Sequence, residues 1–483
     1  MRKAKIVCTI GPASDHLETL DRLIEQGMNA ARLNFSHGTH ASHASAIKTI
    51  REAADQRRAP VAIIQDLQGP RIRVGQVADG GIVLREQQSV RLQTVLARSG
   101  GQLGYESVAG SAIQEIPVTY QHLARDVRPG ARILINDGLI ELKVGQISGG
   151  HLDCTVVVGG TVTSHKGINL PGTRVSAPTL TDKDREDIRF GVTQGVDYVA
   201  LSFVRGPEDI CAAKNLIAEC GGSIPVIAKI ERPEAVSCLE AILEEADGVM
   251  IARGDLGVEM GPEAVPLLQK RIIAEANRRR RLVITATQML ESMTQHVRPT
   301  RAEASDVANA VFDGTDAVML SAETAIGAYP VETVQVMARI ICAAEEGCEP
   351  GMVPKRQSDF GDMTLPEAIC TAASSAASAT KATAIVAFSE LGLTARLISK
   401  QRPAAPVIAF TPFEPVRRQM ALLWGVQPHT MQEIAQTDER VHEAERRLKT
   451  EGLVKTGERI VVLSGTSIGK PGGTNLIKLQ EVE

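Results

Sequence analysis

The sequence is poor in aromatic residues and has no excess of positive charge. Its 483 residues include one Trp, four Tyr and eight Phe, and its 53 Lys and Arg are outnumbered by 57 Asp and Glu. Proteins that bind nucleic acid need a positive surface for the phosphates and often aromatic rings for the bases. The composition therefore predicts no nucleic-acid partner.

Long apolar runs are also missing. No stretch of the sequence has the length of continuous apolar residues that a bilayer-spanning helix requires. Only a short apolar stretch follows the first residues, Met1 to Lys5, so no secretory signal is predicted. We expect a cytoplasmic protein with no membrane partner.

Two classes of short motif are absent. The eight cysteines include no C-x-x-C pair, so the sequence indicates neither a zinc knuckle nor a redox dithiol. A G-x-x-x-x-G-K-[ST] phosphate loop is not found either, which excludes P-loop nucleotide chemistry. If a nucleotide binds, another arrangement of residues must hold it.

What recurs along the chain is a short run rich in Val, Ile and Ala, followed by a polar cluster and an amphipathic stretch of helical period. Strands buried on both faces produce such runs, and their alternation with helices predicts parallel strands with right-handed crossovers. Eight repeats predict an α/β fold with a closed (β/α)8 barrel. The predicted strands are Lys5 to Ile10, Met28 to Leu33, Val61 to Leu67, Val196 to Ser202, Ile224 to Ile230, Gly248 to Ala252, Leu282 to Thr287 and Ala317 to Ser321.

The repeat is interrupted after the third predicted strand. Residues 71–166 alternate in hydrophobicity between Asp-Gly, Gly-Gly and Pro-Gly turns, which predicts a β-barrel domain inserted in a βα loop. Such a loop lies over the catalytic face, so the insert is either a moving lid or a static ornament. The barrel itself is predicted to comprise residues 1–70 and 167–346.

A third domain is predicted for residues 347–483. A polar stretch with several Gly and Pro residues after Ala344 indicates a linker. Helical periodicity from Leu365 to Thr380 and several short apolar strands then predict an open α/β sheet. These strands are Ala384 to Phe388, Val407 to Phe410, Arg459 to Leu463 and one after Asn475.

Every predicted barrel strand ends in polar side chains. The carboxyl ends of barrel strands meet on one face, so these residues are expected to form one site. A single polar residue at a strand end is usually a helix cap, but helix caps do not require Lys, Arg and acidic residues at the same rim. The residues are Thr9, Arg32 with Asn34, Asp66, Ser202, Lys229 with Glu231, Arg253 with Asp255, Thr287 with Gln288, and Ser321 with Glu323.

Two carboxylates in this set suit a metal ion. Lys229 and Glu231 lie on the same side of one strand, and Asp255 follows the next strand along the chain. Two hard oxygen ligands favour Mg²⁺ over zinc. Ion pairing with Lys229 is the alternative, but it leaves one negative charge without a partner.

Other residues in the set suit phosphate. Arg253 to Gly257 form a turn with two glycines between a strand and a helix, a geometry that binds anions through backbone N–H groups. Donors for phosphoryl oxygens are expected from Arg32, Asn34, Ser36, His37 and Arg73. Because no Ser-His-Asp or Cys-His pair is evident, this inventory predicts phosphoryl transfer by positioning and charge stabilisation.

Long motifs in the sequence resemble those of pyruvate kinases, and the resemblance extends in order over essentially the whole chain. The motifs are residues 32–38 (RLNFSHG), 229–231 (KIE), 250–257 (MIARGDLG), 286–293 (ATQMLESM) and 298–303 (RPTRAE). The resemblance implies the last step of glycolysis, in which phosphoenolpyruvate donates its phosphoryl group to ADP. The products would be ATP and an enolate that is protonated to pyruvate.

The resemblance also implies roles for single residues. Arg32 and Lys229 would stabilise the transferring phosphoryl group, Glu231 and Asp255 would hold Mg²⁺ or alternatively Mn²⁺, and the N–H groups of Gly254 and Asp255 would receive the substrate carboxylate. The residues implied in proton delivery to the enolate are Thr287, Ser321 and Glu323. The residues implied in nucleotide binding are Asn34, His37, Arg73 and Lys183.

One departure from the commoner family pattern concerns K⁺. Relatives that need K⁺ bind it near positions matching Asn34, Ser36 and Asp66, with a Thr at the next position and a Glu at the position of Arg71. Here Leu67 supplies no oxygen ligand, and Arg71 brings a permanent positive charge. We predict that Arg71 replaces K⁺; pairing of Arg71 with a surface acid is the alternative.

The family resemblance further implies a homotetramer with an effector pocket in the third domain. The pocket would include Ser389, Gly392, Thr394 and Lys470 and would take a phosphorylated small molecule. Most relatives carry a hydroxyl where Leu391 stands, so fructose 1,6-bisphosphate is not expected to activate this chain. An ordinary helix cap at this turn is the alternative.

Two other classes of function remain open. One is a different Mg²⁺-dependent barrel enzyme acting on phosphoenolpyruvate or pyruvate, which would not need ADP. The other is a catalytically silent regulatory paralogue, although such a protein need not keep Lys229, Glu231, Asp255 and Thr287 together.

Overall fold

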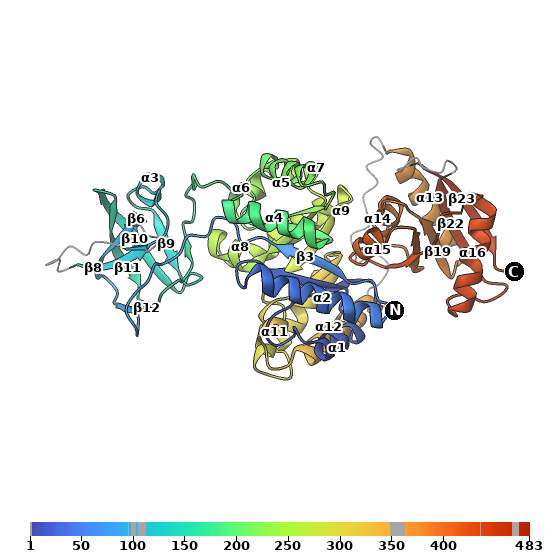
Figure 1. The fold of residues 1–483 in the computed structure, drawn as a ribbon, viewed down its shortest axis with the longest axis horizontal. Helices are drawn as coiled ribbons and strands as arrows, with labels where there is room; N and C mark the ends of the chain where they lie inside the picture. The colour runs from blue at the N-terminus through green and yellow to red at the C-terminus, as the bar shows by residue number, and fades with distance from the viewer. Residues whose placement is uncertain are drawn as a thin grey trace.

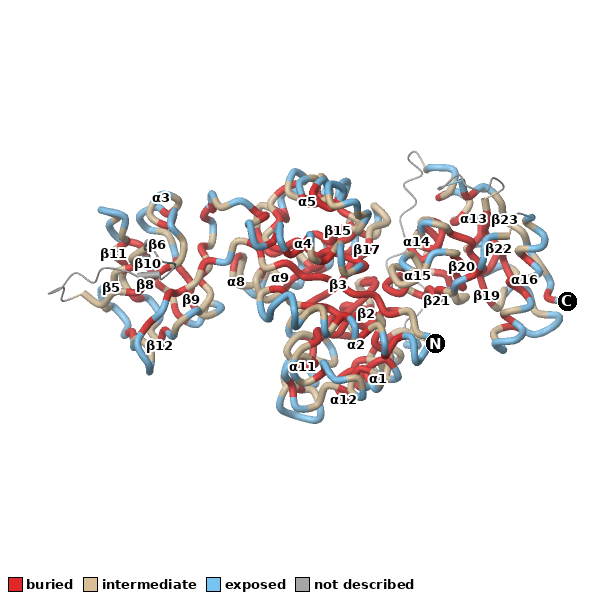
Figure 2. Tube along the Cα trace, viewed as in Figure 1, coloured by how far each residue is buried: buried red, intermediate tan, exposed pale blue. Residues whose placement is uncertain are grey.

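The chain forms three bodies in a row, a central barrel between a β domain and an α/β domain (Figure 1). This computed structural model describes residues 2–94, 96–97, 103–104, 113–347, 363–434, 436–465 and 473–483. In Figure 2 buried residues gather inside each body, so each has its own apolar core.

The central body is the predicted barrel, closed in the order β1-β18-β17-β16-β15-β14-β3-β2 with all neighbours parallel. Each predicted strand is confirmed within two residues at either end. The strands are β1 Lys5–Thr9, β2 Ala30–Asn34, β3 Ala62–Asp66, β14 Tyr198–Leu201, β15 Val226–Ile230, β16 Gly248–Ala252, β17 Leu282–Ala286 and β18 Ala317–Leu320.

Helices cover the outside of this barrel and bury the outward-facing strand residues in one large cluster. Several of them begin at a Thr with a capping box or have a Pro in the first turn, as local sequence rules predict. The helices are α1 Leu17–Glu25, α2 His40–Gln56, α4 Asp182–Gln194, α5 Pro207–Glu219, α6 Pro233–Ser237, α7 Leu239–Glu245, α8 Arg253–Met260, α9 Val265–Arg278, η1 Glu291–Thr294, α10 Arg301–Phe312, α11 Ala322–Ala325 and α12 Pro330–Glu346.

The insert is a β domain, and its main sheet has the strand order β13-β9-β10-β11-β5-β8. Isolated bridges from Arg73 to Gly167 and from Val74 to Val118 place the entry segment between the two edges of this sheet. The elements are β4 Ile82–Leu84, β5 Ser89–Thr94, β6 Leu96–Ala97, β7 Leu103–Gly104, β8 Gln114–Val118, α3 Leu123–Asp126, β9 Arg132–Ile135, β10 Ile140–Ser148, β11 His151–Val158, β12 Gly160–Val162 and β13 Ile168–Asn169.

The insert continues beyond the boundary predicted at residue 166. Strand β13 pairs with β9, and Ile168, Leu170 and Val175 pack in the apolar core of the insert. The boundary was placed too early because a strand of two residues carries no readable alternation.

The third body is the predicted open α/β sheet, with order β21-β20-β19-β22-β23 and only β23 antiparallel. Sequence patterning missed β21, whose Pro428 and polar residues do not read as a buried strand. The elements are α13 Leu365–Thr380, β19 Ala384–Phe388, α14 Leu393–Ser399, β20 Val407–Thr411, α15 Glu414–Met420, β21 Val426–Thr430, α16 Thr437–Thr450, β22 Arg459–Gly465 and β23 Thr474–Glu481. Most of the predicted linker, residues 348–362, lies outside the described residues.

This third body packs against the amino-terminal end of the barrel strands. Leu422, which follows α15, is fully buried in the cluster that fills the barrel interior. Beside it the buried ammonium of Lys5 donates to the carbonyl of Val426 at 2.7 Å. The carboxyl ends of the strands, where the predicted site lies, therefore face the insert instead.

Candidate active site

The polar residues at the carboxyl ends of the strands continue the inward-facing rows of the barrel. Ala30, Ile64 and Ile227 belong to the cluster that fills the interior. Side chains alternate along a strand, so Arg32, Asp66 and Lys229, each two positions farther on, also point inward. The top layer of the barrel is therefore charged and no longer apolar.

These three side chains form one buried ion-pair network. Arg32 Nε lies 2.6 Å from Asp66 Oδ2, and Lys229 Nζ lies 3.2 Å from Asp66 Oδ1. Lys229 also contacts Glu231 Oε1 at 2.9 Å and donates to Ser202 Oγ at 2.7 Å. Burial opposes the charge of Lys229, but Asp66 and Glu231 outweigh it and raise the lysine pKa. Two fixed cations thus lie at the centre of the rim.

Glu231 and Asp255 provide the donor set predicted for a divalent metal. Burial raises the pKa of Glu231, and the nearby charge of Asp255 adds to that rise although Lys229 opposes it. Lys229 neutralises the charge of Glu231 by ion pairing, whereas Asp255 forms no ion pair with a described residue. Ion pairing with Lys229 therefore explains the presence of Glu231 but not that of Asp255. A hard divalent cation would relieve the repulsion between the two carboxylates, and the residues fit Mg²⁺.

Helix α8 begins at the rim, and its first turn is tied to Thr287. The N–H of Gly254 donates to Thr287 Oγ1 at 2.9 Å, and that hydroxyl donates to the carbonyl of Ala286 at 2.7 Å. The Gly254 amide, predicted to receive a substrate carboxylate, is therefore capped by Thr287 in this structure. A bound carboxylate would have to take that amide from the hydroxyl.

The backbone around Thr287 is held in an unfavourable conformation. Thr287 has φ of 70° and Gln288 has φ of 52°, a region that a β-branched residue rarely adopts. Arg253 stabilises this turn by donating to the Thr287 carbonyl at 2.7 Å while pairing with Asp306 Oδ1 at 2.7 Å. In this conformation the Thr287 hydroxyl contacts the first turn of α8.

Glu323 fixes the neighbouring loops. It is fully buried, and its two oxygens accept the N–H groups of Ser321 at 2.6 Å and Leu290 at 3.1 Å. The Ser321 hydroxyl has no hydrogen-bond partner among the described residues. The buried Ser321 hydroxyl therefore has hydrogen-bonding capacity that no described residue uses.

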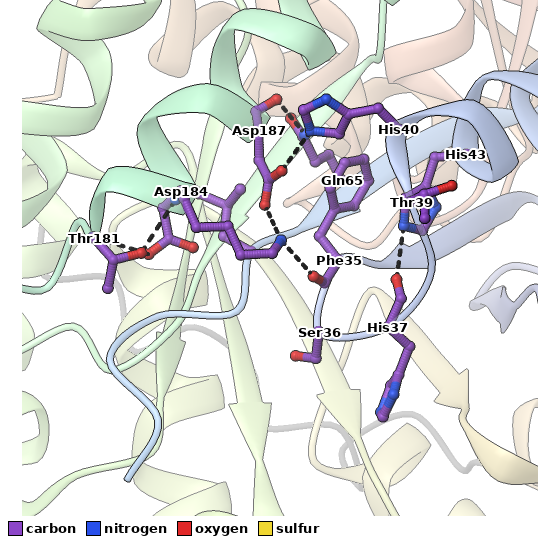
Figure 3. A network of polar contacts seen from close by, with 12 residues as sticks. Phe35, Ser36, His37, Thr39, His40, His43, Gln65, Thr181, Asp184 and Asp187 are labelled. Carbon is purple, nitrogen blue, oxygen red and sulfur yellow. Dashed lines mark hydrogen bonds and ion pairs between the residues drawn. The ribbon is translucent and has the colours of Figure 1, made fainter. Parts of the chain in front are cut away.

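The loop after β2 carries three of the predicted nucleotide and cation residues. Asn34 Oδ1 accepts the N–H of Ser36 at 3.2 Å, and the carbonyl of Phe35 accepts Lys183 Nζ at 2.9 Å. Lys183 also lies 2.6 Å from Asp187 Oδ2, in the contact network of Figure 3. Helix α4 thus holds this loop against the rim.

A cleft of about 590 Å³ lies between the insert and the rim. Its lining includes His37, Arg71 and Arg73 on one side and Asp255 on another. Burial and the neighbouring Arg71, Arg73 and Arg32 lower the pKa of His37, so its imidazole is neutral near pH 7. These crowded cations suit an anionic ligand such as a chain of phosphates.

Two family models match the chain, the pyruvate kinase barrel domain over residues 1–334 and the pyruvate kinase alpha/beta domain over residues 367–480. The chain belongs to the pyruvate kinase family. Among similar curated proteins, pyruvate kinase 2 of Synechocystis is 47% identical to this chain, and the pyruvate kinase of Geobacillus stearothermophilus is 45% identical. Each match covers 100% of this chain and 80% of the relative. A crystal structure of a pyruvate kinase from Cryptosporidium parvum matches with a TM-score of 0.89 and 37% identity, over 100% of this chain and 96% of that one.

The chain is accordingly a phosphotransferase with pyruvate kinase function. Membership of the family settles the barrel and the C-terminal α/β domain, as the sequence predicted. It also excludes an unrelated barrel enzyme as the source of the motifs. No helix in the described parts of the chain is long and apolar enough to cross a membrane.

Sequence reasoning gave no role to several residues that build this pyruvate kinase site. Thr9 accepts Arg32 NH1 at 3.0 Å, Ser202 accepts Lys229, and the N–H of Phe203 donates to Glu231 Oε2 at 2.7 Å. Thr9 and Ser202 were recognised only as polar strand ends. They point into the barrel, as Arg32 and Lys229 do, and this shared orientation is the signal that identifies them.

The fold brings together only some of the residues that the sequence predicted around the K⁺ position. Asp66 pairs with Arg32 and Lys229, whereas Leu67 is buried at 1% exposure and offers no oxygen. Arg71 is exposed in the cleft and forms no ion pair with a described residue. This geometry gives no support to the alternative in which Arg71 pairs with a surface acid.

The predicted effector turn lines a separate small pocket of about 80 Å³ in the C-terminal domain. Ser389 Oγ accepts the N–H of Thr394 at 3.1 Å, and Thr394 Oγ1 lies 2.6 Å from Thr474 Oγ1. Gly392 has φ of 78° at the start of α14, and Leu391 is 62% exposed. Lys470 lies outside the described residues.

Proposed function

We propose that the chain transfers the phosphoryl group of phosphoenolpyruvate to ADP with the rim residues in fixed roles. The observation that carries this proposal is the buried network in which Asp66 holds both Arg32 and Lys229 at the centre of the rim. Two cations fixed before the substrate arrives stabilise a moving phosphoryl group without reorganisation. Thr287 lies on the opposite side, beside α8, where it can serve the enolate.

Glu231 and Asp255 would hold Mg²⁺, or Mn²⁺ in its place. Such an ion would supply positive charge that offsets the negative charge of the phosphoryl group. The two carboxylates orient the site, while Lys229 and the N–H of Phe203 keep Glu231 in place. Removal of divalent ions with a chelator should therefore abolish activity and leave the fold intact.

The nucleotide phosphates would enter the cleft on the side of His37, Arg71 and Arg73, and Lys183 and Asn34, on or beside the loop that carries His37, would also contact them. Support comes from the arginines around His37, whose positive charges add to burial in lowering the pKa of that imidazole. A neutral His37 can accept or donate a hydrogen bond, whereas the arginines supply the charge.

The direct test is a coupled assay for ADP-dependent pyruvate formation, run with and without Mg²⁺. Pyruvate should appear only when phosphoenolpyruvate, ADP and Mg²⁺ are all present. Lys229→Met should lower kcat by about 10²- to 10³-fold, as loss of one preorganised cation does. Pyruvate formation without ADP, or full activity of Lys229→Met, would contradict the roles proposed for these residues.

We further propose that this enzyme needs no K⁺, because the guanidinium of Arg71 occupies the place of the ion. Activity in K⁺-free buffer, with a bulky organic cation at equal ionic strength, should match activity with K⁺. Arg71→Glu should lower activity and create a K⁺ requirement, most clearly with Leu67→Thr alongside. A wild-type enzyme that is inactive without K⁺ would refute this proposal.

The assembly, regulation and location of the enzyme are proposed from the family alone. We infer a homotetramer acting in the cytoplasm, with a phosphorylated small molecule at the pocket of Ser389, Gly392, Thr394 and Lys470. Sedimentation should give a mass near four times the 51.6 kDa of the chain. Fructose 1,6-bisphosphate should not lower the half-saturation concentration of phosphoenolpyruvate.

A further inference from the structure

Asp187 on α4 is a buried acid that touches neither the rim cations nor the cleft. Its side chain is 2% exposed, yet its two oxygens are each matched to a basic group that reaches toward solvent. Oδ2 lies 2.6 Å from Lys183 Nζ, and Oδ1 lies 2.7 Å from His40 Nε2. Figure 3 shows Asp187 beside His40, with Phe35 and His37 on the adjoining loop.

The backbone of α4 is docked onto the barrel without this carboxylate. Gln65 Nε2 on β3 donates to the backbone carbonyl of Asp187 at 2.6 Å, and Gln65 lies so close to Gly191 that a Cβ there would be 2.0 Å from Gln65 Oε1. The side chain of Asp187 is therefore not needed to seat the helix. Burying a carboxylate costs free energy unless it is paired with basic groups. We therefore attribute the burial of the Asp187 carboxylate to its pairing with Lys183 and His40.

Lys183 reaches the loop that carries Asn34, Ser36 and His37, and the His40 ring lies beside that loop, with its centroid 6.4 Å from that of Phe35. Lys183 donates to the Phe35 carbonyl at 2.9 Å, while the N–H of Phe35 donates to the Asp66 carbonyl at 2.9 Å. The Phe35 ring is buried and stacks on His43 with centroids 4.0 Å apart, and His40 stacks on Phe190 at 4.4 Å. The loop is thus anchored to the catalytic network at one end and to α4 at the other.

We propose that Asp187 is a positioning residue for the nucleotide: its carboxylate fixes the Lys183 ammonium at the loop Asn34 to His37, and His40 locks that carboxylate. Lysine is a flexible point charge with three donors, and orienting it in advance lowers the entropy lost when phosphates bind. Two donors are taken by Phe35 and Asp187, which leaves the third for a phosphate oxygen. This inference rests on the proposed nucleotide role of Lys183.

The test uses Asp187→Asn in the full-length enzyme. An amide keeps the shape of the side chain but loses the negative charge that holds the Lys183 ammonium. We expect the KM for ADP to rise roughly tenfold, the loss typical of one charge-assisted hydrogen bond. The KM for phosphoenolpyruvate, bound by Arg32 and Lys229, should stay within about twofold.

Asp197→Asn is the matched control. Asp197 is also buried, at 2% exposure, and also pairs with two cations, Arg51 at 2.7 Å and Arg418 at 2.8 Å. It lies at the other end of the barrel, beside the C-terminal domain. This variant should lose stability much as Asp187→Asn does and keep its KM for ADP.

A double-mutant cycle with Lys183→Met separates the positioning role of Asp187 from the proposed nucleotide role of Lys183. If Asp187 acts through Lys183, adding Asp187→Asn to Lys183→Met should not raise the KM for ADP further. A full additional rise, or an unchanged KM for ADP in Asp187→Asn alone, would overturn the positioning role. If Lys183→Met itself leaves the KM for ADP unchanged, the nucleotide role of Lys183 fails instead.

A second variant covers the case in which Asp187→Asn does not fold. His40 is half-exposed, so His40→Ala removes one partner of the carboxylate without opening the core. A smaller rise in the KM for ADP, with the KM for phosphoenolpyruvate unchanged, supports the proposal. An unchanged KM for both substrates contradicts it.

Discussion

At the scale of single residues, Thr287 has a strained backbone, and its hydroxyl is engaged in a hydrogen bond with the Gly254 amide. Its positive φ and the grip of Arg253 hold the hydroxyl against the Gly254 amide. Strained residues persist where the surroundings determine them, and they are concentrated at functional sites. A carboxylate that takes the amide would release the hydroxyl beside the forming enolate.

Thr287→Val should therefore separate the two halves of the reaction. Valine keeps the shape but removes the proton-carrying group, so proton exchange into pyruvate should fall by about 10²- to 10³-fold. Phosphoryl transfer, for which Arg32 and Lys229 are the proposed residues, should fall much less. Tritium exchange from pyruvate and single-turnover ATP formation measure the two steps, and equal losses in both would count against this role.

At the scale of elements, the segment that returns from the insert is held by arginines of the barrel. Arg205 NH1 donates to the Val175 carbonyl at 2.8 Å and NH2 to Thr179 Oγ1 at 3.1 Å. Arg232 NH2 donates to the Thr173 carbonyl at 2.9 Å. This segment is the tether through which the insert is oriented over the cleft.

Arg205→Lys should loosen that tether, because a single ammonium cannot bond both acceptors as the planar guanidinium does. Loss of one hydrogen bond of about 1 kcal/mol should speed amide exchange severalfold in residues 173–180. Hydrogen-exchange mass spectrometry measures this effect. Arg174→Lys, at an exposed arginine in the same segment, is the control; equal exchange in both variants would refute the tether.

At the scale of the whole molecule, the barrel and the C-terminal domain bury lysines between them. Burial lowers the pKa of Lys5 from its ordinary 10.5 to about 7, and Arg2 adds to the shift. Burial likewise lowers the pKa of Lys400 to about 8, although Asp316 opposes the shift. Near neutral pH this interface therefore contains lysines that give up protons more readily than lysines in water.

Between pH 7 and 10 the unfolded chain holds more protons on Lys5 than the folded one. The stability contributed by Lys5 is therefore greatest near pH 10.5 and is lost as the pH falls through about 7. Relative to Lys5→Met, the free energy of unfolding of the wild type should rise by roughly 1–2 kcal/mol between pH 7 and 9. This rise is below the limit of about 1.4 kcal/mol for each pH unit that one titrating group can contribute. Urea unfolding midpoints measure this gain; a pH-independent difference would contradict the buried-lysine assignment, and Lys48→Met is the exposed control.

The sequence by itself determined the barrel, the order of its strands and the residues at their carboxyl ends. Those features depend on local alternation and on the rule that parallel strand ends share one face, both of which are readable without coordinates. The long motifs identified the family because each of them consists of a few consecutive residues, which can be recognised without knowing the fold. Strand β21 and the end of the insert escaped detection because short or Pro-containing strands carry little periodicity.

Only the tertiary structure decided which charges meet and which are already satisfied. It brought Asp66 between Arg32 and Lys229, capped the Gly254 amide with Thr287, and placed Asp187 behind Lys183. These partners come from elements far apart in the chain, and their distances follow from barrel closure and helix packing. Periodicity fixes the face on which a residue lies, whereas a contact of 3 Å between distant segments depends on how the whole fold packs.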